Sequence, residues 1–228
     1  MNYLRSLIPA ALVLALAGCT TAPKQSTAPH PKAVAPLAVL ASNAELSEKA
    51  RACQELGSFG GPESVPALTA LLNHEYLADY ARSGLEGIQD PSAGKALRDA
   101  LVTLTGRNLA GAVNSLGVRR EVAAVPDLQK LALDPKRGVA PEALASLGMI
   151  GTTEAAKTLQ KVLADGPADL RVPAAHAAIM AAAQLAKDGN AAASRGLLES
   201  VVRSLPPGHI ATVAQNQLTA LRAKPATK

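Results

Sequence analysis

The chain has 228 residues and a net charge of +5, and only 2% of its residues are aromatic, none of them tryptophan. This length suits one domain or a repeat array, whereas so few large side chains do not suit the core of a globular α/β protein. Alternating runs of Val, Ile and Thr are also missing from the sequence, so we expect no sheet.

The N-terminus carries an apolar run from Leu7 to Ala17 behind a single charge, Arg5. The run is shorter than the ~20 residues that span a bilayer as a helix. Its basic start and its small residues at the end are typical of a secretory signal peptide. The sequence Leu16-Ala17-Gly18-Cys19 resembles the lipobox of bacterial lipoproteins at all four positions. This resemblance implies cleavage of residues 1–18 and attachment of lipid to Cys19.

In that family an aspartate after the cysteine favours the inner membrane, so Thr20 implies the outer membrane. We therefore expect a protein of the bacterial envelope that is held to the membrane by its N-terminal lipid and faces the periplasm. The alternative is an ordinary secretory signal that happens to contain a cysteine. Residues 19–36 are rich in Pro, Ala and Thr without an apolar period, which predicts an extended tether.

Residues 37–224 contain a repeated pattern, Ala-x-x-x-Leu, with a further leucine or equivalent twelve residues beyond. The steps between units are 29, 31 and 31 residues, and the pattern resumes after a step of 38. A spacing of four residues puts each pair on one helical face, so each unit is expected to hold two helices joined by a turn. The pairs are Ala52/Leu56, Ala81/Leu85, Ala112/Leu116, Ala143/Leu147, Ala181/Leu185 and a half-unit at Ala214/Leu218.

The segments SVPALTALL, AVPDLQKLAL and EALASLGMIGTTEAAKTLQKVL resemble HEAT-like repeats of the compact bacterial type, related to phycobilin-lyase repeats. This resemblance covers roughly residues 45–222. It implies an all-α, right-handed α-solenoid of about five HEAT-like helix pairs with helical caps, in which stacked units bury their apolar faces together. Residues 225–228 are expected to form a tail.

Two departures from the pattern are expected to affect the stack. Arg82 stands where other units have Cys53, Val113 and Leu144, so the second unit is expected to be tilted or frayed. The insertion around residues 165–173 lengthens the first helix of the fifth unit and is either a binding loop or a kink in the stack. Cys53 itself is expected to be buried, as free cysteines often are, although a reactive thiol or an intermolecular bridge is the alternative.

The sequence contains no recognisable catalytic or metal-binding constellation. Its four histidines are scattered, without the Cys or Asp spacing typical of zinc, and glycine-rich phosphate loops and nucleophile elbows are missing. We therefore expect no enzyme activity, no cofactor or metal and no small-molecule substrate; a bilin lyase or an unrecognised enzyme is the alternative. Export and the lack of an aromatic platform argue against nucleic acid as a partner.

The second helices, which line the concave face in HEAT-like folds, are predicted to carry a basic stripe. The basic stripe comprises Lys95, Arg98, Gln129, Lys130, Lys157, Gln160 and Lys161. We expect it to bind an unidentified envelope protein with acidic groups, for which the chain is a scaffold or adaptor. The alternative partner is an anionic envelope polymer, either peptidoglycan or lipopolysaccharide.

Overall fold

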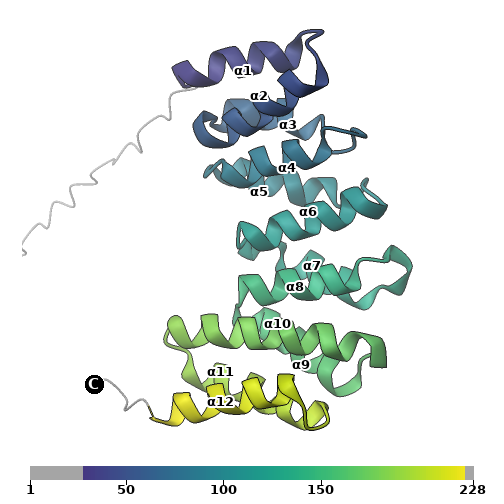
Figure 1. Ribbon diagram of the computed structural model, residues 1–228, viewed down its shortest axis with the longest axis vertical. Coiled ribbons are helices and arrows are strands. Elements are labelled where there is room, and N and C mark those ends of the chain that lie inside the picture. Colours follow the sequence, from purple (N-terminus) through teal and green to yellow (C-terminus); the bar gives the residue numbers. More distant parts are fainter. Residues whose placement is uncertain (1–27, 224–228) are drawn as a thin grey trace, which may run out of the picture.

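The computed structural model describes residues 28–223, which contain twelve α-helices and no strand. The helices stack in two layers along one long axis, so that each pair lies beside the next (Figure 1). The predicted all-α solenoid is therefore confirmed.

The solenoid consists of five helix pairs between two end helices. The first helices of the pairs are α2 (Leu46–Phe59), α4 (Ala78–Gly87), α6 (Gly106–Val118), α8 (Ala140–Ile150) and α10 (Ala168–Lys187). The second helices are α3 (Val65–Thr69), α5 (Pro91–Ala100), α7 (Val125–Leu133), α9 (Thr153–Asp165) and α11 (Ala191–Ser204). The end helices are α1 (Pro31–Ala41), which packs on α2, and α12 (His209–Ala223), which packs on α11.

Prolines and capping side chains start the second helices. Pro66, Pro91 and Pro126 occupy the first turns of α3, α5 and α7, where a missing N–H costs little. The carboxylate of Asp90 accepts the Ser92 N–H at 2.9 Å, and this hydrogen bonding lowers the pKa of Asp90.

The repeated positions form one continuous core. Each leucine of the first four Ala–Leu pairs has 0% of its surface exposed, and so do the leucines twelve residues further on. These are Leu56, Leu85, Leu116 and Leu147 on the first helices, and Leu68, Leu97, Leu128 and Leu159 on the second. Cys53 is buried among them, as predicted, and burial raises the pKa of its thiol to about 11.

The helical domain begins earlier than the sequence predicts. Residues 31–36, expected to belong to the tether, form the start of α1, where Ala33 and Pro36 are buried. His30 caps this helix, because its Nδ1 accepts the Lys32 N–H at 3.2 Å, and its ring stacks on Phe59 with centroids 6.1 Å apart. The predicted signal peptide, the lipid-bearing Cys19 and the tail lie outside the described residues.

Arg82 does not fray the second unit. Helix α4 is intact, and the Arg82 side chain, 13% exposed, lies between α4 and α6 against Gly111, where a Cβ would collide with the guanidinium group. The arginine is therefore accommodated between the two helices without unwinding either of them.

The insertion in the fifth unit lies further along α10 than the sequence predicts. Gly148 packs against Ala177, and Gly151 lies against Gln184. These contacts place α10 beside α8 with the same 31-residue spacing as between the preceding units. Ala174 and Ala178 therefore occupy the positions in α10 that Ala143 and Leu147 occupy in α8. Ala174 and Ala178 are fully buried. The extra residues are consequently the last two turns of α10, which project beyond the end of α8 (Figure 1), and not residues 165–173.

Candidate functional site

A groove of about 510 Å³ lies between the second helices α5 and α7. The nearly buried Leu101 and Leu131 line it together with Val102, whose surface is 82% exposed. Six charged side chains of both signs also line it: Arg98, Asp99, Asp127, Lys130, Asp134 and Arg137. The groove thus combines one exposed apolar side chain with charged side chains of both signs.

The structure brings only two residues of the predicted basic stripe, Arg98 and Lys130, into this groove. Lys157 and Lys161 are exposed on the adjacent α9. Gln129 links neighbouring units, because its Nε2 donates to Thr158 Oγ1 at 2.7 Å. The amide of Gln160 lies 3.5 Å from Ser200 Oγ on α11.

Acids on the same helices neutralise most of the lysines in the basic stripe. Each of three lysines forms an exposed ion pair with an acid three or four residues away, an arrangement that contributes little stability. The pairs are Lys95–Asp99, Lys130–Asp127 and Lys157–Glu154, with N···O distances of 2.5, 3.1 and 2.7 Å. Instead of a positive column, this face therefore presents alternating charge, with Lys161 free of ion pairs among the described residues.

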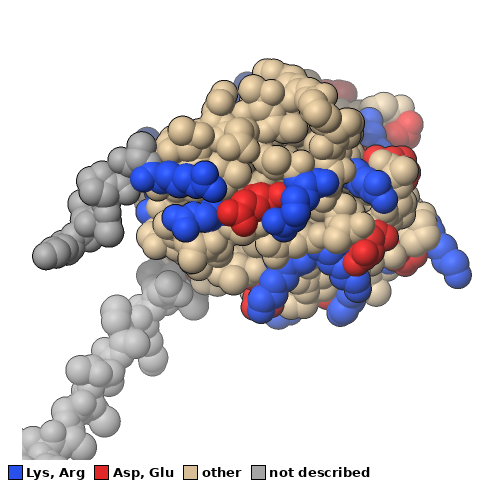
Figure 2. Space-filling view, turned by 90° about the horizontal axis from the view of Figure 1, so that it is seen from below, with Lys and Arg blue, Asp and Glu red and all other residues tan. Residues whose placement is uncertain are grey.

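Figure 2 shows the same mixture at one end of the solenoid. Seen from the α11–α12 end, Lys and Arg side chains gather over one part of the surface with Asp and Glu among them, while the upper part of the view is almost bare of charge. At this end of the solenoid, the charged side chains therefore lie mostly outside the upper part of the view.

Three arginines that the sequence analysis did not single out bind the carboxyl ends of helices in neighbouring units. Arg119 donates to the carbonyls of Leu85 and Glu86 at 2.6 and 3.2 Å, and also to that of Ile88. Arg137 donates to the carbonyls of Leu101 and Leu104 at 2.8 and 3.2 Å, and Arg120 to that of Ile150 at 3.2 Å. Positive charge is favourable at helix carboxyl ends. The basic residues in the inter-helix turns were therefore the sequence feature that could have predicted these contacts.

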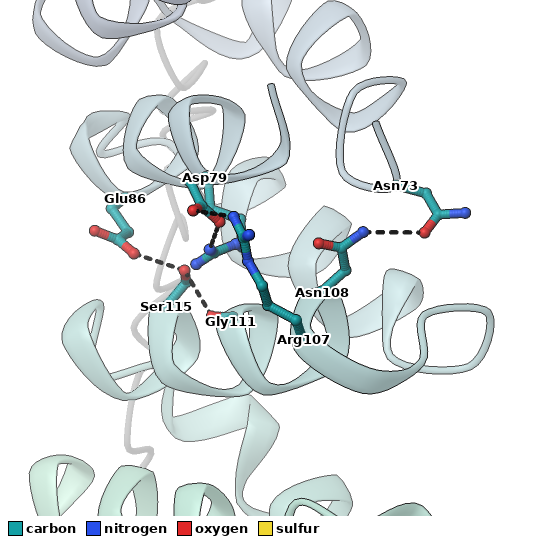
Figure 3. A network of polar contacts seen from close by, with 8 residues as sticks. Asn73, Asp79, Glu86, Arg107, Asn108, Gly111 and Ser115 are labelled. Carbon is teal, nitrogen blue, oxygen red and sulfur yellow. Dashed lines mark hydrogen bonds and ion pairs between the residues drawn. The ribbon is translucent and has the colours of Figure 1, made fainter. Parts of the chain in front are cut away.

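A polar network joins α4 to α6 (Figure 3). Asp79 binds the guanidinium groups of Arg82 and Arg107, the latter at 2.5 Å. Burial alone raises the pKa of Asp79, but hydrogen bonds and charge from the two arginines outweigh it and hold the pKa below its ordinary value. Ser115 Oγ also donates to Glu86 at 2.6 Å, so this joint is held by polar contacts as well as by the core.

Within residues 28–223, no group of three or more His, Cys, Asp or Glu side chains is placed to hold a metal ion. Across the same residues, no helix has both the length and the apolar character needed to cross a membrane.

The model of a protein family described as HEAT repeats matches residues 106–183. These residues run from α6 through most of α10, so the chain contains HEAT-like repeats, as the sequence predicts. The match begins at the first residue of α6 and so includes the α6 side of the polar joint with α4. No curated protein matches the chain significantly.

Proposed function

We propose that this protein is a non-enzymatic scaffold that binds another protein on its second-helix face, chiefly through the groove between α5 and α7. The observation that carries the proposal is the exposed Val102, which lines the groove together with buried leucines and with charged side chains of both signs. Peptide segments combine apolar side chains with acids and bases, so they complement such a surface.

The mixed charge favours a protein over an anionic polymer. A polymer such as peptidoglycan or lipopolysaccharide is attracted by unpaired cations, but Lys95, Lys130 and Lys157 already have acidic partners. Only a weak net field is then left to draw a polyanion to this face, and salt screens it further.

We further propose that the scaffold works in the bacterial envelope, held at the outer membrane by lipid on Cys19 and facing the periplasm. The lipobox resemblance at residues 16–19 supports this location. Cys19→Ser is expected to prevent lipid labelling and processing. A variant that incorporates radiolabelled palmitate and matures like the wild type contradicts the proposed anchor.

The groove is tested by placing a photo-crosslinking amino acid at Val102 in the intact, membrane-bound protein. The matched control places the same group at Ala145, which is exposed on α8 in the other layer of helices. We expect a discrete protein adduct from position 102 that is absent from position 145. Equal adducts from both positions, or adducts to polysaccharide alone, refute the proposed binding face.

A further inference from the structure

The last two turns of α10 create a second hollow on the layer of first helices. They project past the end of α8 (Figure 1) and, with the carboxyl ends of α6 and α8, enclose about 410 Å³. We call this hollow the α10 notch; its apolar lining includes Val118, Met149, Met180 and Ala183. The notch lies on the opposite layer of the solenoid from the groove between α5 and α7.

Two glycines in the lining of the α10 notch let its helices pack closely. Gly117 and Gly148 line it, and a Cβ on either would lie 2.8 or 2.7 Å from backbone atoms of the next helix. In the same lining, Val118 and Met180 are 51% and 46% exposed. A flexible, polarisable methionine adapts to differently shaped apolar partners, so Met149 and Met180 suit a hollow that receives a foreign side chain.

The charged side chains that line the α10 notch are both cations, Arg120 and Lys187. Neither forms an ion pair with another described residue. The nearby acid Asp188 accepts a hydrogen bond from Gln184 at 2.6 Å and does not line the notch. The notch is therefore apolar with a positive rim, in contrast to the mixed charge of the groove.

Arg120 is held at this rim in an unfavourable backbone conformation. Its φ of 52° is the only positive φ of a non-glycine residue within residues 28–223. The turns that follow α8 and α10 have glycine, Gly151 and Gly189, in the same left-handed conformation. Glycine is easier to accommodate at such a position, but only a long side chain such as that of Arg120 reaches both the Ile150 carbonyl and the notch.

From this combination we infer that the α10 notch binds a short amphipathic helix of an acidic protein. An aliphatic side chain of the ligand lies between Met149 and Met180, and an adjacent carboxylate lies near Arg120 and Lys187. Helices commonly dock in this way, with apolar anchors in a groove and charges at its border. This site is independent of the proposed function, because it uses other residues on the other layer of helices.

The test uses a displayed library of helical peptides selected on the full-length protein, with Met180→Glu as the notch variant. Val172→Glu is the matched control, because Val172 is 47% exposed on the same helix but outside the notch. We expect enriched peptides to carry Leu, Ile or Met beside Asp or Glu. They should bind Val172→Glu normally and Met180→Glu roughly tenfold or more weakly, since an apolar contact is replaced by a repelled carboxylate.

A second pair of variants tests the charged rim. Lys187→Gln and Arg120→Gly should each reduce the preference for acidic over matched neutral peptides while leaving thermal unfolding close to wild type. The inference is overturned if no peptide is enriched, if the enriched peptides are basic, or if they bind Met180→Glu as tightly as wild type. It is also overturned if Met180→Glu instead abolishes self-association or binding to phosphatidylglycerol vesicles, since the occupant is then a second copy or a lipid surface.

Discussion

Two helical glycines with opposite surroundings give a sharp test of how closely the first helices pack. In Gly148→Ala the new methyl group would lie 2.7 Å from the Cα and the carbonyl oxygen of Ala177 on α10. In Gly196→Ala on α11 the nearest atom is the Gln160 amide nitrogen at 3.8 Å, which is an ordinary contact. The two substitutions are chemically identical, so their difference reports on the packing alone.

Alanine is favoured over glycine in a helix interior by about 1 kcal/mol, and this gain applies at both positions. At Gly148 the clashing atoms are backbone, which cannot rotate away, so α8 and α10 must separate. Overpacking of this kind costs about 1–3 kcal/mol. We therefore expect Gly148→Ala to be destabilised by up to about 2 kcal/mol and Gly196→Ala to be stabilised by up to about 1 kcal/mol.

Thermal unfolding followed by circular dichroism at 222 nm measures both variants. For a domain of this size about 1 kcal/mol shifts Tm by roughly 2–4 °C, so the two midpoints should move in opposite directions by amounts that are easily resolved. If Gly148→Ala raises Tm as much as Gly196→Ala does, the close approach of α8 to α10 is wrong, and with it the register that places the extra turns of α10 beyond α8.

Substitutions at three further positions test the core and the helix ends. Leu147→Asp should destabilise by several kcal/mol in urea unfolding, because it buries a charge between stacked units; unchanged unfolding would mean that this leucine is not in the core. Arg119→Ala should cost about 2–4 kcal/mol through lost charged hydrogen bonds to carbonyls, and Arg119→Lys should recover less than half of that loss; a lysine variant as stable as the wild type would contradict this role. The thiol of Cys53 has its pKa raised from 9.0 to about 11, so its contribution to stability is complete below pH 9 and is lost as the pH rises towards 11. Cys53→Ala should therefore flatten the alkaline fall in unfolding free energy between those values, and a fall as steep as in the wild type would refute this assignment.

The repeat was predictable because buried leucines must recur wherever one unit stacks on the next. The leucines at 56, 85, 116 and 147 recur at nearly constant steps and are all fully buried. The ion pairs along the basic stripe were also visible in the sequence, since pairs such as Lys95/Asp99 and Glu154/Lys157 have the spacing that brings side chains together on a helix. These pairs reduce the charge of the stripe without making it neutral, because Lys161 has no ion pair among the described residues.

The start of the domain was not predictable from composition. A stretch of Pro, Ala and Thr resembles a linker, and α1 owes its stability to tertiary contacts: Ala33 and Pro36 are buried where it packs on α2. Pro31 suits the first turn of a helix, but that position alone does not distinguish a helix start from an extended segment.

The position of the insertion in α10 was ambiguous for a geometric reason. The pairs Ala174/Ala178 and Ala181/Leu185 lie seven residues apart, which is two helical turns, so both fall on the same face. In a helix this rich in alanine, the pattern of apolar residues fits either pair, and the larger Leu185 made the later one more conspicuous. Only the contacts of Gly148 with Ala177 and of Gly151 with Gln184 identify the pair that continues the stack.

Arg82 shows how a departure from the repeat is accommodated by a change elsewhere in the chain. A long side chain in the place of Cys53 or Leu144 needs both volume and polar partners. Gly111 on α6 provides the volume, because it has no side chain where the guanidinium group lies, and Asp79 provides the charge. In the sequence, Arg82 stands out as an exception to the repeat. Gly111 lies 29 residues away on another helix, so neither residue alone predicts that α4 and α6 pack together intact. Together they do: Gly111 leaves room for the arginine across the interface, while Asp79, on α4 itself, compensates its charge.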